Sequence, residues 1–156
     1  MAEYRLTTWW RVEAPLEAVW EAIYHPDRWP DWWPGVEQVL ELSPGDERGI
    51  GAVHRYTWKS VLPYRLSFDM RVTRIERLVA LEGVACGELD GRGCWQFSRD
   101  GELTVVRYDW QVQTGKRWMN WLEPIARPLF RWNHDVVMRA GGLGLARLLS
   151  ARLVEG

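Results

Sequence analysis

The sequence is poor in the residues from which metal sites are built. Its 156 residues include only two cysteines and three histidines, His25, His54 and His134. These residues lack the spacing of a metal site, because neither a His-Glu-x-x-His nor a Cys-x-x-Cys motif occurs. We therefore expect no bound metal and no cofactor.

The two cysteines, Cys86 and Cys94, are predicted to be free thiols. They fall in a predicted hairpin whose two loop residues are Asp90 and Gly91. In that register Cys94 lies opposite Gly87, and the side chains of the two cysteines point to opposite faces of the sheet. Free thiols suit a reducing cytoplasm.

Sequence motifs of other chemistries are missing as well. There is no Gly-x-Ser-x-Gly nucleophile elbow. Gly141, Gly142 and Gly144 are not followed by the Gly-Lys-Ser/Thr sequence of a phosphate-binding loop. We therefore assign no catalytic residue from a motif.

Charge and hydropathy exclude two further classes of protein. The net charge is -1 and the basic and acidic residues are interleaved, whereas a nucleic-acid-binding protein usually has a basic patch. No stretch reaches the roughly 18 apolar residues of a membrane helix, and residues 1–20 show no signal-peptide pattern. We expect a cytoplasmic protein without an integral membrane segment, acting as a monomer or weak dimer.

Tryptophan, in contrast, is abundant. Its large indole ring fills a core well, but it also carries one N–H group that needs a hydrogen-bond partner. The tryptophans therefore indicate a core of large side chains, an aromatic-lined cavity, or both. The twelve are Trp9, Trp10, Trp20, Trp29, Trp32, Trp33, Trp58, Trp95, Trp110, Trp118, Trp121 and Trp132.

Hydrophobic periodicity predicts a single α+β domain spanning residues 1–156. A strand at 4–12 precedes a helix that begins near residue 14 and ends near 24, before Pro26. Alternating patterns then predict strands at 36–42, 50–59, 64–76, 79–89, 93–99 and 103–114.

The rest of the chain, 117–154, predicts one long helix. Pro124 and Pro128 should kink it or break its first turn, and the glycines at 141, 142 and 144 should loosen it. An apolar helix after a meander of strands lies across the covered face of the sheet, which must curl around it. The predicted apolar stripe of this helix comprises Trp118, Trp121, Leu122, Ile125, Leu129, Trp132, Val136 and Ala140.

Several short motifs make the chain resemble the START-like, or SRPBCC, superfamily, with its helix-grip fold of the birch-pollen-allergen type. This superfamily includes the polyketide cyclase/dehydrase and lipid-transport families. The motifs are Ala14-Pro15-x-Glu17-x-Val19-Trp20, Trp29-Pro30-x-Trp32-Trp33-Pro34-Gly35-Val36, Gly49-x-Gly51, Gly87-Glu88-Leu89-x-Gly91-x-Gly93 and Thr104-x-Val106-x-Tyr108-x-Trp110.

The resemblance implies a seven-stranded, curved antiparallel sheet wrapped around the C-terminal helix, with two short helices after the first strand. It also implies an elongated cavity between sheet and helix. Members bind sterols, lipids, polyketides, quinones or plant hormones, and a minority are aromatases, cyclases or hydroxylase components. A shared fold does not by itself fix the chemistry.

The predicted cavity wall combines inward-facing strand positions with the sheet-facing side of the long helix. Such cavities are lined mainly by apolar and aromatic groups with a few polar anchors. The predicted ligand-binding residues are His54, Tyr56, Trp58, Phe68, Met70, Trp95, Tyr108, Trp110, Trp121, Trp132 and His134.

Three titratable residues are candidates for acid–base chemistry. His54 and His134 are either core histidines with a hydrogen-bond partner or polar groups that contact the ligand, because a buried group without a partner is costly. Glu88 is a raised-pKa acid if its strand face is inward and a surface charge if it is outward. We favour the outward position.

The leading functional hypothesis is binding, and potentially transport, of a hydrophobic small molecule such as a lipid, quinone or polyketide. His54, His134, Tyr56 and Tyr108 would orient it. One alternative is a polyketide cyclase, aromatase or dehydratase that uses acid–base residues in the cavity. The other is a protein-interaction module, for which the tryptophans of residues 28–34 would form an exposed patch.

Overall fold

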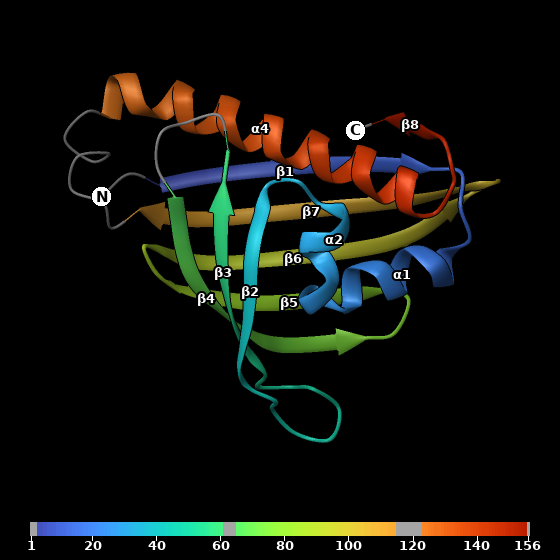
Figure 1. Cartoon of the computed structure of the whole chain (residues 1–156), viewed down its shortest axis with the longest axis horizontal. Coiled ribbons are helices and arrows are strands. Elements are labelled where there is room, and N and C mark those ends of the chain that lie inside the picture. The colour runs from blue at the N-terminus through green and yellow to red at the C-terminus, as the bar shows by residue number, and fades with distance from the viewer. Residues whose placement is uncertain (1–2, 61–64, 115–122, 156) are drawn as a thin grey trace.

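A computed structural model describes residues 3–60, 65–114 and 123–155. Figure 1 shows one long helix lying along a strongly bent sheet, with two smaller helices at the side. In chain order the elements are β1 (Glu3–Val12), α1 (Leu16–Tyr24), η1 (Pro26–Arg28), α2 (Trp29–Trp32), β2 (Val36–Ser43), β3 (Val53–Lys59), β4 (Arg65–Glu76), β5 (Ala80–Gly87), β6 (Leu89–Asp100), β7 (Leu103–Thr114), α4 (Glu123–Leu148) and β8 (Leu153–Glu155).

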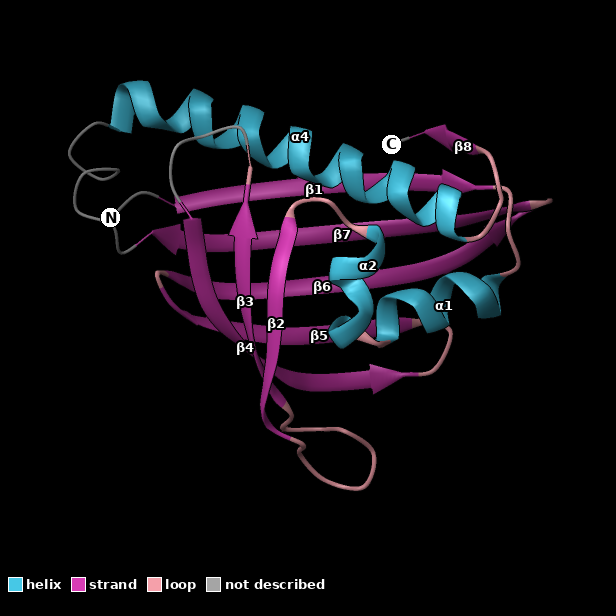
Figure 2. Ribbon diagram, in the orientation of Figure 1, coloured by secondary structure: helices cyan, strands magenta, loops and turns pink. Residues whose placement is uncertain are grey.

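The strands form one antiparallel sheet in the order β2-β3-β4-β5-β6-β7-β1-β8. Strands β2 to β7 follow one another as a meander, and β1 then pairs with β7. In Figure 2, β2 and β3 run across the direction of β6 and β7, so the sheet curls around α4. The predicted α+β fold, with a curved antiparallel sheet around a long C-terminal helix, is confirmed.

Alternation along β7 separates a covered face from an outer face. Val106, Trp110 and Val112 are buried, while Arg107 and Asp109 pair with each other on the outer side. One strand can therefore carry a wall of the interior and part of the solvent-facing surface.

An eighth strand, β8, departs from the predicted seven-stranded sheet. The long helix ends at Leu148 because Ser150 adopts a left-handed backbone conformation with φ of 50°. The N–H of Ala151 then donates to the Ala146 carbonyl (2.8 Å) and that of Ser150 to the Arg147 carbonyl (3.2 Å). These two bonds form a Schellman motif, which releases the chain to pair with β1.

The glycines of α4 do not loosen it, contrary to the prediction. The helix is continuous across them, and each glycine lies where a tryptophan residue comes very close. A Cβ at Gly141 would lie 2.4 Å from the Trp33 ring, and a Cβ at Gly144 would lie 1.8 Å from the backbone carbonyl oxygen of Trp32. The glycines therefore permit close packing of α4 against α2.

α4 contains both prolines, whereas residues 117–122 of the predicted helix lie outside the described residues. Pro124 lies in the first turn of α4, where a backbone N–H has no helical partner in any case. Pro128 lies inside the helix without ending it.

The hairpin of β5 and β6 has a different register from the predicted one. Ala85 pairs with Gly91 and Glu82 with Cys94, so the turn precedes Asp90 rather than including it. Gly91 is instead inside a strand, where a Cβ would lie 2.0 Å from the Gln111 carbonyl oxygen of β7. Both cysteines are nevertheless free, as predicted.

Candidate functional site

The tryptophans of residues 28–34 form an inner wall rather than an exposed patch. Trp29, Trp32 and Trp33 are all buried. The indole of Trp29 donates to the Ile23 carbonyl (3.1 Å) and that of Trp33 to the Val137 carbonyl (2.9 Å), which ties α2 to α1 and α4. The interaction-module hypothesis loses the exposed surface on which it rested.

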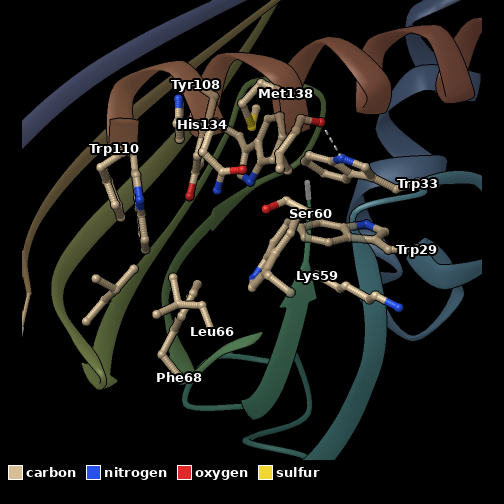
Figure 3. Close-up of a pocket in the computed structure, with 16 residues that line it drawn as sticks. Trp29, Trp33, Lys59, Ser60, Leu66, Phe68, Tyr108, Trp110, His134 and Met138 are labelled. Atoms are coloured by element: carbon tan, nitrogen blue, oxygen red, sulfur yellow. Dashed lines mark hydrogen bonds between the residues drawn. The ribbon is translucent and has the colours of Figure 1, made fainter. Parts of the chain in front are cut away.

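A cavity lies between this wall, the sheet and the middle of α4, and we call it the α4 cavity. Its volume is about 90 Å³. Figure 3 shows His134 projecting from α4 into the space above Leu66 and Phe68 of β4. The other residues that line it are Trp29, Trp33, Trp58, Lys59, Ser60, Leu89, Trp95, Tyr108, Trp110, Phe130, Asn133, Val137 and Met138.

Three residues of the α4 cavity carry buried polar atoms for which the described part of the chain offers no hydrogen-bond partner. These atoms are the indole nitrogen of Trp58, the side-chain oxygen of Asn133 and both ring nitrogens of His134. A buried polar group without a partner costs about 1–3 kcal/mol. A cavity that holds several such atoms is suited to a ligand that supplies their partners.

His134 is a neutral group at physiological pH. Its side chain is 11% exposed, and its Nδ1 lies 3.8 Å from Asp135 Oδ1, which is too far for a hydrogen bond. Burial lowers the pKa of His134 to about 4, although the Asp135 carboxylate opposes the shift. The imidazole can therefore donate one hydrogen bond and accept another.

A second cavity of about 240 Å³ lies toward α1, and we call it the α1 cavity. His54, Tyr56 and Met70 line it together with residues of α1 and η1. Burial lowers the pKa of His54, whereas the nearby Glu41 and Asp27 carboxylates oppose the shift. His54 Nε2 lies 3.8 Å from Glu41 Oε1.

An aromatic partition separates the two cavities. Trp29, Trp95 and Tyr108 line both of them, and the rings of Trp95 and Tyr108 are 4.2 Å apart. Burial raises the pKa of Tyr108 well above its ordinary value, so this hydroxyl stays protonated. His54 and His134 line different cavities.

Most of the predicted ligand-binding residues line one cavity or the other. Trp121 lies outside the described residues. The residues at the α4 cavity are Trp58, Phe68, Trp95, Tyr108, Trp110 and His134; those at the α1 cavity are His54, Tyr56 and Met70, with Trp95 and Tyr108 shared.

The structure corrects the predicted position of Trp132. Half of its surface is exposed, and it lines neither cavity. Helical geometry explains the error, since residues separated by two positions point to nearly opposite sides of a helix. Phe130, Asn133 and His134 face inward, so Trp132 points out.

Glu88 is half-buried in the turn between β5 and β6 rather than within a strand. Its Oε2 accepts a hydrogen bond from the backbone N–H of Ser67 at 2.6 Å, and it lines neither cavity. Within residues 3–60, 65–114 and 123–155, no cluster of three His, Cys, Asp or Glu residues could hold a metal ion.

Some lining residues were missed by the sequence reasoning. Asn133 and Met138 lie on the inward side of α4, with the buried Ala126 and Phe130, but the exposed side of the helix also carries apolar residues and hid this pattern. Trp29 and Trp33 were predicted only as part of the exposed patch of residues 28–34. Their proximity to the cavity depends on tertiary packing that no local pattern encodes.

The bent sheet, the gripped helix and the aromatic-lined cavities together define a helix-grip protein of the START-like superfamily. Residues 4–149 match the family described as "Polyketide cyclase / dehydrase and lipid transport". The chain belongs to this family. No curated protein matches the sequence.

Solved structures share the fold at low sequence identity. The Zhui aromatase/cyclase from Streptomyces sp. R1128 is 16% identical, with a TM-score of 0.77 over 96% of this chain and 94% of its own. A START superfamily protein from Mycobacterium smegmatis is 12% identical, with a TM-score of 0.75 over 94% and 97%. The ginseng major latex-like protein 151 from Panax ginseng is 10% identical, with a TM-score of 0.72 over 94% and 97%.

These likenesses establish the fold alone. Among the described residues, no helix is long and apolar enough to cross a membrane.

Proposed function

We propose that the protein binds a hydrophobic small molecule in the α4 cavity. The observation that carries this proposal is an aromatic-lined space beneath α4 in which several polar atoms lack partners. Removing apolar ligand surface from water favours binding by about 25 cal/mol per Å², before the costs of association. The family, whose description names both cyclases and lipid transport, supports a ligand of this kind.

Binding is favoured over catalysis by the positions of the histidines. An acid–base mechanism needs groups within hydrogen-bond reach of one reacting substrate. His54 and His134 line different cavities, and Glu88 lines neither. The function proposed here is therefore binding or transport, carried out in the cytoplasm, where Cys86 and Cys94 remain reduced.

Native mass spectrometry and solvent extraction of the purified protein test the proposal. The wild-type protein should retain an apolar compound from its expression host. Leu66→Trp, which places an indole in the α4 cavity, should abolish retention. Leu143→Trp makes the same substitution on the exposed side of α4 and should retain the compound like the wild type.

Two results would contradict the proposal. One is a wild-type protein that retains no apolar compound and binds none when it is supplied. The other is equal retention by the Leu66→Trp and Leu143→Trp variants, which would place the ligand outside the α4 cavity.

A further inference from the structure

We infer that the α4 cavity selects a neutral ligand whose apolar body carries a hydroxyl group, and that Trp58, Asn133 and His134 bind that hydroxyl. This inference rests on the proposed function and adds the chemical class of the ligand. It begins from the polar atoms of the cavity rather than from its apolar surface.

The three residues come from two elements on opposite sides of the same space. Trp58 is in β3, while Asn133 and His134 are adjacent in α4. All three line the α4 cavity, and the Trp58 indole nitrogen, the Asn133 Oδ1 and both His134 ring nitrogens are buried without a hydrogen-bond partner among the described residues. The inferred position of the ligand hydroxyl is between these residues of the sheet and the helix.

The complementary roles of these atoms specify a hydroxyl. The Trp58 indole can only donate, and the Asn133 side-chain oxygen can only accept. Neutral His134 can do either, because it has one N–H and one free nitrogen. A hydroxyl accepts from one side and donates to the other, so a single group can satisfy both kinds of partner.

The charges around the cavity disfavour an anion. Among the described residues that line the cavity, Lys59 alone is cationic, and it is exposed. In Figure 3 its side chain extends away from His134. A carboxylate placed near Trp58 would lose its hydration without meeting a buried cation, which is costly.

Three probes of similar size test the hydroxyl contact and the selection against an anion: p-cresol, p-xylene and p-toluate. The first is the side-chain analogue of tyrosine, the second replaces its hydroxyl by a methyl group, and the third is an anion. Binding of each is measured by titration calorimetry with the full chain at pH 7. p-Toluate should bind at least about tenfold more weakly than p-cresol.

Variants test each proposed contact. Trp58→Phe, Asn133→Leu and His134→Leu should each lower the affinity for p-cresol about tenfold, while p-xylene binds equally well or more tightly. His134→Gln keeps a donor and an acceptor and should retain p-cresol binding. Trp132→Phe, on the exposed side of the same helix, is the matched control and should leave both affinities unchanged.

The outcomes distinguish this inference from the proposed function. If the ratio of p-cresol to p-xylene affinity is the same in the wild type and in all three variants, the hydroxyl site is wrong while the apolar cavity stands. If p-toluate binds as tightly as p-cresol, the selection for a neutral ligand is wrong. If no probe binds and no host compound is retained, the proposed function itself fails.

Discussion

The two halves of α4 are held in different ways. The C-terminal half is fixed by hydrogen bonds to its backbone: the indole of Trp10 donates to the Met138 carbonyl (3.0 Å) and that of Trp33 to the Val137 carbonyl (2.9 Å). Leu145 is completely buried. The N-terminal half covers the α4 cavity and exposes Ile125 and Trp132, of which 63% and 50% are accessible.

The C-terminal half of α4 is therefore anchored to the rest of the fold, and we call it the anchored half. The N-terminal half faces the cavity, and we call it the roof half. Val137 and Met138 are the positions four residues before Gly141 and Gly142, so glycine leaves their carbonyls open to a second donor from an indole. The N-terminal half contacts β1 through Phe130, whose ring lies 4.2 Å from that of Tyr4.

The largest expected loss of stability comes from adding a methyl group where the anchored half of α4 contacts α2. Gly144→Ala should lower the free energy of unfolding by about 3 kcal/mol, because its Cβ would meet the Trp32 carbonyl and the helix would have to move. An ordinary interior helix position would instead gain about 0.5–1 kcal/mol from this change. Urea denaturation measures the difference.

Leu143→Ala is the matched control, one residue away on the exposed side. It should change the free energy of unfolding by less than about 0.5 kcal/mol. A Gly144→Ala protein as stable as the wild type would show that α4 and α2 are not in close contact.

His134, in the roof half of α4, should make the free energy of unfolding depend on pH. The pKa of His134 is about 4 in the folded protein, below its ordinary value of 6.5. Between those two pH values the unfolded chain binds a proton that the folded chain excludes. The free energy of unfolding should therefore decrease as the pH is lowered, and His134 should account for about 2–3 kcal/mol of this decrease.

The measurement compares urea denaturation of the wild type and of His134→Leu from pH 7.5 to pH 4. The leucine variant should lose less stability over this range, and the two curves should run parallel above pH 7. Parallel curves throughout would mean that His134 is hydrated and has an ordinary pKa.

Replacing a buried tryptophan should lower the free energy of unfolding more than replacing a half-exposed one, although both effects are smaller than the two above. Trp33→Phe removes the hydrogen bond to the Val137 carbonyl and part of a buried ring, so we expect a loss of about 1–2 kcal/mol. Trp132→Phe should cost less than about 0.5 kcal/mol, because its ring is half exposed. Thermal unfolding of both variants provides the check, and equal losses would remove the distinction between the halves.

The sequence predicted the architecture better than the cavity. Alternation along β7 and the apolar content of the last third were enough for the sheet and its helix. The register of β5 and β6 was wrong because Asp90-Gly91 resembles a turn, whereas Gly91 allows a close approach to β7. Trp132 was misplaced because α4 carries apolar residues on both faces, so its periodicity did not identify the inner one.

The cavity could be predicted only as a class of site. That Trp58, Asn133 and His134 line the same cavity depends on the curl of the sheet and on the axial rotation of α4, which are set by packing. The division into two cavities depends on contacts among Trp29, Trp95 and Tyr108 from three distant segments. No local spacing in the sequence carries that information.

The most direct test of ligand binding under α4 is the NMR spectrum of the indole N–H groups during a titration with p-cresol. Trp58→Phe and Trp10→Phe variants assign the two relevant signals. The Trp58 signal should shift as its unpartnered N–H meets the ligand, while the Trp10 signal, bonded to the Met138 carbonyl, stays in place. A stationary Trp58 signal at saturating p-cresol, or an equal shift of the Trp10 signal, would contradict binding of a hydroxyl ligand beneath the roof half of α4.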